Sequence, residues 1–280
     1  MKQSSPSLGA KNVGVIVKSL TKVLMVQKKF FCTIRLILNT LYMIIWTAQY
    51  VQFVPLERRS ITMKLKEAQA KIKTICNIPF ADIFEELDFP MIIKNKGKTG
   101  QLLEMALGKK LDNANIDFED GELKSNKCDA TGRPLETVFI TQIASIIDEL
   151  IVEKPFEETH LYEKINNMLY VPVCKVGDPH NWMFLDAIHI DLSKPEFSSL
   201  LNIWRDDYYS ICRQLKEHIE TSKDGFIHTS NGRHIQVRSK DSKPYHPIYS
   251  KIYGRKVSNK NHAFYFQKQF VYDVRIAYGG

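Results

Sequence analysis

Beyond Met63, apolar residues follow two different periods, and this constrains the fold more than any other feature of the chain. Spacings of three and four residues, typical of amphipathic helices, occur over 64–76, 81–87, 101–107, 159–167 and 196–220. Short alternating or continuous apolar runs, typical of β-strands, occur over 121–124, 137–143, 168–173, 183–190, 234–240 and 263–271. Helices and strands are interleaved along the chain. We therefore predict an α/β fold, a mixed sheet flanked by helices in a single main domain.

Residues 1–62 differ from the rest of the chain. Their apolar run from Phe30 to Val54 is interrupted by polar residues such as Arg35, so it is not a clear transmembrane segment, and no secretory cleavage site follows it. A membrane-touching anchor and an extra helix packed on the domain are two interpretations. We favour a third, an over-long start assignment, because Met63 opens a regular amphipathic stretch. We expect residues 1–62 to lie outside the domain and to be dispensable.

Charge divides the remaining chain into two parts. The net charge of the whole chain is +8, but residues 63–222 are acidic overall, whereas 223–280 hold eleven Lys/Arg against three acidic residues. Carboxylates are suited to metal ions and a basic segment to phosphates. We interpret 63–222 as a catalytic part and 223–280 as a basic DNA-recognition part. Two solvated faces of opposite charge are the simpler alternative.

The cysteines and the glycine pattern exclude several classes of site. Five cysteines are scattered without a CxxC pair, which argues against a disulfide framework or a zinc site and favours the reducing cytoplasm. Cys128 lacks the local His/Asn partner signature that would indicate a cysteine nucleophile. The chain has no GxxxxGK[ST] loop, so we predict no nucleotide cofactor.

A charged motif lies between Ile116 and Ile140. Asp117, Glu122 and Lys124 have the spacing D-x4-E-x-K. On a strand, Glu122 and Lys124 share one face, and an Asp at the preceding turn can join Glu122 to bind a divalent cation. Lys124 would then lie where negative charge develops on a phosphate under attack. Taken alone, the motif fits a surface turn with an ion pair better than a metal site.

Five other segments accompany this motif in a fixed order: NKGKTGQLLEMALG, GRPLETVF, KINNMLYVPV, HIQVRSK and AFYFQKQF. Together with the motif they resemble the MutH/Sau family of GATC endonucleases within the PD-(D/E)xK superfamily. The resemblance covers 64–271 and implies a restriction-endonuclease-like fold. Ile116 stands where the superfamily pattern has Pro before the Asp.

The resemblance assigns catalytic roles. It makes Asp117, Glu122 and Glu104 the ligands of Mg²⁺, with Lys124 as the catalytic lysine and Lys164 as a second active-site lysine near the phosphate. The implied reaction is hydrolysis of DNA phosphodiester bonds.

The resemblance also assigns recognition roles. Arg238 and Lys240 would read guanine edges in the major groove, a task that the forked Arg side chain suits. Tyr265 matches a residue that senses adenine methylation. Backbone contacts are implied for Lys96, Gly97 and Lys98, and phosphate contacts are expected from the basic residues Lys243, Lys251, Arg255, Lys256, Lys260 and Lys268.

Two biological roles follow from the family, and a third alternative lies outside enzymes. The gap from Asp117 to Glu122 is shorter than in MutH and resembles the restriction branch, which favours a type II restriction enzyme acting as a homodimer on double-stranded GATC. A mismatch-repair nickase that responds to MutL is the alternative. A catalytically silent DNA-binding relative is the third.

Overall fold

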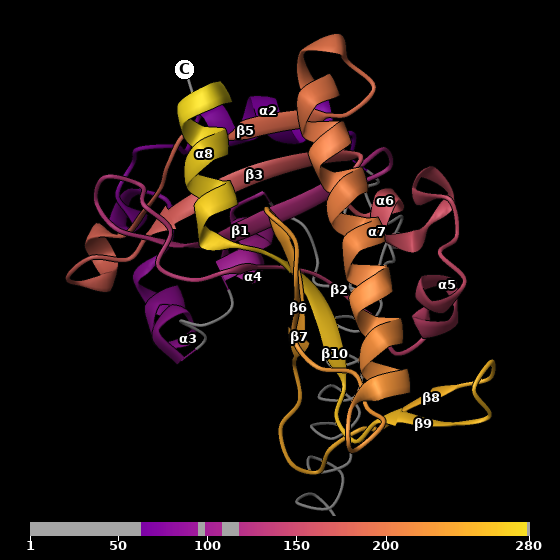
Figure 1. Cartoon of the computed structure of the whole chain (residues 1–280). Coiled ribbons are helices and arrows are strands. Elements are labelled where there is room, and N and C mark those ends of the chain that lie inside the picture. Colours follow the sequence, from indigo (N-terminus) through magenta and orange to yellow (C-terminus); the bar gives the residue numbers. More distant parts are fainter. Residues whose placement is uncertain (1–62, 95–98, 108–117, 279–280) are drawn as a thin grey trace, which may run out of the picture. The chain divides into compact units, whose positions relative to one another are not determined.

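The computed structural model describes residues 63–94, 99–107 and 118–278, which lie in one compact unit (Figure 1). The predictions for residues 1–62, including their position outside the domain, concern residues that the structure does not describe, and they stay predictions.

The α-helices are α2 (Leu65–Lys73), α3 (Phe89–Lys94), α4 (Thr99–Ala106), α5 (Ile147–Ile151), α6 (His160–Glu163), α7 (Ser198–Thr221) and α8 (Lys268–Tyr278). Short 3₁₀ turns are η1 (Phe80–Asp82), η2 (Glu86–Asp88), η3 (Phe156–Glu158), η4 (Pro179–Asn181) and η5 (Pro195–Phe197).

The strands form two four-stranded sheets and a hairpin. In the first sheet, β1 (Glu122–Cys128) pairs in parallel with β3 (Asn167–Cys174), which also pairs antiparallel with β4 (Met183–Phe184) and β5 (Ile188–Asp191). The second is antiparallel, in the order β2 (Val138–Gln142), β10 (His262–Phe266), β7 (Ile235–Ser239), β6 (Ser230–Asn231). A separate hairpin consists of β8 (Ile248–Ser250) and β9 (Arg255–Ser258). The prediction of a mixed α/β fold is confirmed, with the strands divided between two sheets.

Strand β3 separates two hydrophobic cores. Leu169, Val171 and Val173 face the core built with α2, α3 and α4. Met168 and Tyr170 face the larger core that contains α5, α7, α8 and the second sheet. Because strand side chains alternate, a strand buried on both faces must be apolar at nearly every position, and the sequence MLYVPV fulfils this.

Two strand predictions were wrong in part. The run 263–271 is a strand only to Phe266, after which α8 begins at Lys268. Phe270, Val271 and Val274 are buried at helical spacing, and α8 could be recognised only from this change of period. The run 183–190 is divided into β4 and β5 because its antiparallel pairing with β3 shifts by one residue between Phe184 and Ile188.

Helix bounds also differ from the predictions. The helix expected over 81–87 is replaced by the 3₁₀ turns η1 and η2. The helix expected over 159–167 ends at Glu163, since Asn167 already belongs to β3. In the described part of the chain, no helix is both long and apolar enough to span a membrane.

The larger core depends on Trp204 of α7. Its side chain is fully buried, and its ring lies 5.0 Å from that of Phe266 and 5.4 Å from that of Phe270 between ring centres. We expect Trp204→Ala to lower the free energy of unfolding by about 3–5 kcal/mol, because it leaves a large cavity. Urea denaturation measures this. The control Ile276→Ala removes a side chain that is 68% exposed and should change stability by less than about 0.5 kcal/mol. Equal losses for the two variants would contradict the packing described.

Candidate active site and DNA-recognition surface

A buried carboxylate lies between two ammonium groups at the start of β1. Glu122 is 3% exposed. Its Oε2 accepts a hydrogen bond from Lys124 Nζ at 2.5 Å, and its Oε1 accepts one from Lys164 Nζ at 2.7 Å. We call Glu122, Lys124 and Lys164 the lysine–carboxylate cluster. It brings together three of the five residues predicted to be catalytic.

Local structure explains how these three side chains meet. Glu122 and Lys124 are two residues apart on β1 and therefore lie on the same face of the sheet. Lys164 is the C-terminal cap of α6, a single helical turn fixed at its other end by Thr159, whose Oγ1 accepts a hydrogen bond from Tyr162 N. Three residues later the chain enters β3, whose Met168 is the register partner of Glu122. The pairing of β3 with β1 therefore places Lys164 close to Glu122 on β1.

The cluster carries one more positive charge than negative. Both lysine side chains are mostly buried, with 9% and 12% exposed for Lys124 and Lys164. Two ammonium groups against one carboxylate leave an excess positive charge, which attracts a phosphate and suits an anionic transition state.

A second group of predicted residues lies on the antiparallel sheet. Arg238 is exposed near the end of β7, and its guanidinium lies 4.4 Å from the ring centre of Tyr265 on β10. The ammonium of Lys240, just beyond β7, lies 3.3 Å from the ring centre of Phe139 on β2. The two rings are themselves 5.7 Å apart, edge to face. We call Arg238, Lys240, Tyr265 and Phe139 the recognition surface.

Burial changes two of the titrating groups of this surface. Partial burial lowers the pKa of Lys240 and raises the pKa of Tyr265. A less hydrated ammonium gives up less water when it contacts a base or phosphate, so this environment suits Lys240 to binding.

Phe139 was not singled out from the sequence, although it ends the segment GRPLETVF. It is 37% exposed on a strand whose neighbours Val138 and Ile140 are buried. A large aromatic side chain on the exposed face of this strand is the unusual feature, and it is visible only in the structure.

Comparison with known proteins finds similarity to several MutH proteins. No protein-family model matches the chain. A curated protein of Buchnera aphidicola named DNA mismatch repair protein MutH is 29% identical over 202 residues, 69% of this chain and 88% of that protein. The protein of the same name from Vibrio cholerae is 27% identical over 228 residues, 75% of this chain and 94% of its own. The Haemophilus influenzae protein of that name is 31% identical over 119 residues, 40% of this chain and about half (52%) of its own.

Over most of its length the chain is similar to proteins named DNA mismatch repair protein MutH.

Two further residues, Asp117 and Glu104, are predicted to complete the metal site. Asp117 lies outside the described residues, as do Lys96, Gly97 and Lys98 of the glycine loop. Glu104 is half-buried on α4, which packs against β1, and its part in the metal site stays a prediction. Within 63–94, 99–107 and 118–278, no three His, Cys, Asp or Glu residues form a metal-binding group.

The donor chemistry around Glu122 nevertheless fits a hard divalent cation. Mg²⁺ is bound in proteins by one or two carboxylates together with water and substrate phosphate. Glu122 supplies one carboxylate beside two phosphate-attracting lysines, and Asp117 precedes it by five residues.

Cys128, at the end of β1, is unsuited to act as a nucleophile. It is fully buried, and burial raises the pKa of its thiol to about 12. The thiol is therefore protonated at neutral pH, in agreement with the interpretation of the sequence.

One of the predicted phosphate contacts has a different role. The guanidinium of Arg255 donates hydrogen bonds to the carbonyl oxygens of Gly225 at 2.8 Å and Ile219 at 3.0 Å. It thus ties β9 to the C-terminal end of α7, where carbonyl groups lack helical partners. These donors are not available to a phosphate.

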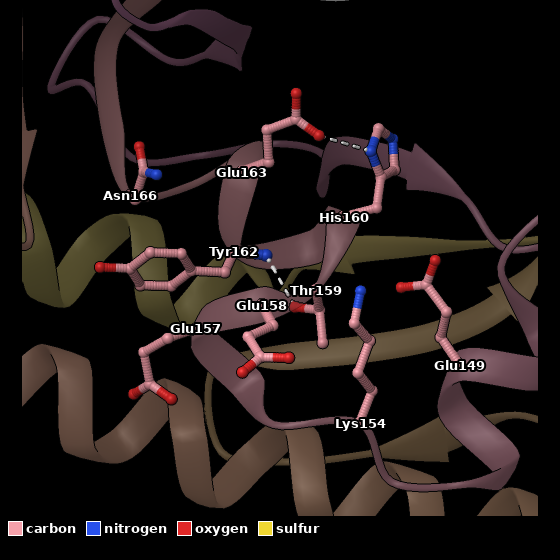
Figure 2. A pocket seen from close by; sticks show the side chains of 9 residues that line it. All are labelled: Glu149, Lys154, Glu157, Glu158, Thr159, His160, Tyr162, Glu163 and Asn166. Atoms are coloured by element: carbon pink, nitrogen blue, oxygen red, sulfur yellow. Dashed lines mark hydrogen bonds and ion pairs between the residues drawn. The ribbon is translucent and has the colours of Figure 1, made fainter.

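A pocket of about 480 Å³ lies beside η3 and α6, and Figure 2 shows the side chains that line it. Four of them are glutamates, Glu149, Glu157, Glu158 and Glu163, against the cation of Lys154 and the imidazole of His160. His160 and Glu163 are joined by a hydrogen bond, with 3.0 Å between Nδ1 and Oε2. Such a lining repels a nucleic-acid backbone, so we do not assign the pocket to DNA binding.

The lysine–carboxylate cluster gives a stability prediction. Glu122→Gln removes the anion that holds two ammonium groups together in a buried place, so we expect the free energy of unfolding at pH 7 to fall by about 3 kcal/mol. Urea denaturation measures the loss. The control Glu163→Gln changes a carboxylate at the end of α6 that is 43% exposed, and it should cost less than about 1 kcal/mol. Unchanged stability of Glu122→Gln would show that the pairing is not formed in solution.

Proposed function

We propose that this protein is a Mg²⁺-dependent endonuclease that hydrolyses phosphodiester bonds of double-stranded DNA at GATC sites. The observation that carries the proposal is the buried Glu122 carboxylate held by Lys124 and Lys164. The names of the MutH relatives, which are DNA repair proteins, support DNA as the substrate.

The catalytic residues have separate tasks in this proposal. Held by Asp117 and Glu122, with Glu104 completing the site, Mg²⁺ would supply positive charge beside the scissile phosphate and activate water. Lys124 and Lys164 hold their ammonium groups beside the Glu122 carboxylate. There they would stabilise the negative charge that develops on the phosphate oxygens. Glu122 holds both ammonium groups in position before DNA arrives.

Sequence recognition is assigned to the recognition surface. Arg238 and Lys240 would donate to guanine O6 and N7 in the major groove. Tyr265 would contact the adenine edge, where a methyl group alters the fit. Lys96, Gly97 and Lys98 would contact the backbone of the duplex. Four cysteines, Cys76, Cys128, Cys174 and Cys212, are free thiols, which supports a location in the reducing cytoplasm.

Each of two cellular roles, restriction and mismatch repair, has one observation in its favour. The short spacing from Asp117 to Glu122 favours type II restriction, in which two copies cut both strands of the palindrome. The repair names of the relatives favour a strand nickase that acts with MutL. No nucleotide cofactor is part of either proposal.

The activity is tested on plasmid DNA. With Mg²⁺ the full chain should cut unmethylated GATC sites, with the ends mapped by sequencing, and adenine-methylated plasmid tests the role of Tyr265. Asp117→Ala should abolish cleavage while GATC binding in Ca²⁺ remains, and the exposed neighbour Glu119→Ala is the matched control. Linear product identifies restriction, and nicked circles that increase with MutL identify repair. GATC binding without any cleavage would leave a silent DNA-binding protein, and full activity of Asp117→Ala would refute the metal site.

Arg238 should govern discrimination rather than chemistry. We expect Arg238→Ala to reduce the ratio of cleavage at GATC to cleavage at sites with one changed base by about 10- to 100-fold, since a bidentate guanine contact contributes about 1–3 kcal/mol. Competition between the two sites in one reaction measures the ratio. Arg233→Ala removes an exposed positive charge just before β7 and should leave the ratio unchanged. An unchanged ratio for Arg238→Ala would remove this residue from the recognition surface.

A further inference from the structure

A buried carboxylate on α7 holds the turn that leads into β7. Asp207 is 5% exposed, in the middle of a helix whose neighbouring residues belong to the larger core. Its Oδ1 accepts a hydrogen bond from Arg233 N at 2.5 Å, and its Oδ2 accepts from His234 N at 2.7 Å and Ile235 N at 2.9 Å. Three consecutive backbone amides of the β6–β7 turn therefore converge on one side chain.

The turn is shaped to admit this carboxylate. A Cβ atom on Gly232 would lie 2.3 Å from Cγ and Oδ1 of Asp207, so only glycine allows the approach. Gly232 N donates to Ile235 O at 2.8 Å, and Gly232 O accepts from the side chain of Gln267 at 2.7 Å. Removing a carboxylate from water is costly, and here several amide donors compensate for it.

The other end of the same strand is held in a similar way. Asp241, one residue beyond Lys240, accepts hydrogen bonds from the backbone amides of Asn261 and His246. These bonds lower the pKa of the Asp241 carboxyl group, which therefore stays charged. Between the two anchors, β7 is paired with β10, with Arg238 opposite Ala263.

We propose that Asp207 is a positioning residue for DNA sequence recognition, which sets the place of β7 and through it of Arg238 and Lys240. This rests on the proposed function of the recognition surface. Arg238 is three residues beyond the last amide that Asp207 holds, and the side chains that read bases must keep their positions to within a fraction of an ångström. A carboxylate fixed to a core helix sets that position relative to the whole domain.

The test compares Asp207→Asn with two other variants of the full chain. The Asn side chain keeps one oxygen that can accept hydrogen bonds. Its NH₂ group faces backbone N–H groups of the turn, which are donors as well, so part of the hydrogen bonding is lost. Gly232→Ala disturbs the same contact from the turn, because its added methyl group meets the Asp207 carboxylate. It replaces Asp207→Asn in the test if that variant folds poorly. Asp206→Asn, on the exposed side of α7, is the matched control.

Two readouts are measured below the unfolding transition of each variant. The first is the ratio of cleavage rates at GATC and at sites with one changed base, which does not depend on the fraction of active protein. The second is hydrogen–deuterium exchange of the segment 233–240. We expect Asp207→Asn and Gly232→Ala to lower the ratio at least tenfold and to speed exchange in this segment, with Asp206→Asn like the wild type.

The outcomes separate the two proposals. A wild-type ratio in both variants, or a loss of both rates in equal proportion, would overturn the positioning role and leave the proposed function intact. A wild-type protein without preference for GATC would overturn the proposed function and the recognition role together. Unchanged exchange over 233–240 would show that Asp207 does not hold the strand at all.

Discussion

The parallel pairing of β1 with β3 is the constraint on which the rest of the structure depends. Because β3 is buried on both faces, it fixes the position of β1 relative to two cores at once. The register places Glu122 opposite Met168, four residues beyond Lys164. The lysine–carboxylate cluster is therefore a consequence of strand pairing, and its lysines come from two elements that are 40 residues apart in the sequence.

The single carboxylate shared by two lysines allows two ammonium groups to be buried together and still leaves a positive charge. Two ammonium groups that are mostly buried would repel each other, and Glu122 compensates for that repulsion. The compensation is incomplete, since one positive charge remains. This remaining charge, unhelpful to folding, is what a phosphate-binding site requires. The Thr159 cap and the short helix α6 keep Lys164 at the place where both needs are met.

The surface proposed for recognition lies on a different sheet from the lysine–carboxylate cluster, and the chain connects the two directly. Strand β1 leads through a loop to β2, which carries Phe139 beside Tyr265 and Lys240. The loop is fixed by Asp129, whose Oδ1 accepts hydrogen bonds from the backbone amides of Thr131 and Arg133. Carboxylate-to-amide contacts thus recur where an irregular segment must have a defined shape: at Asp129, Asp207 and Asp241. Each replaces the regular hydrogen bonding that a loop lacks.

The sequence by itself determined the α/β class, the long helix α7, the strand β3 and the shared face of Glu122 and Lys124, because all of these follow from local periodicity. Motif order brought Lys164, Arg238 and Tyr265 into consideration but gave no distances. Only the tertiary structure decided that Lys164 contacts Glu122, that Phe139 completes the recognition surface and that Arg255 binds a helix end. It also decided that Asp207 holds a turn more than 20 residues away. These features depend on contacts between segments distant in sequence, and no local pattern encodes such contacts.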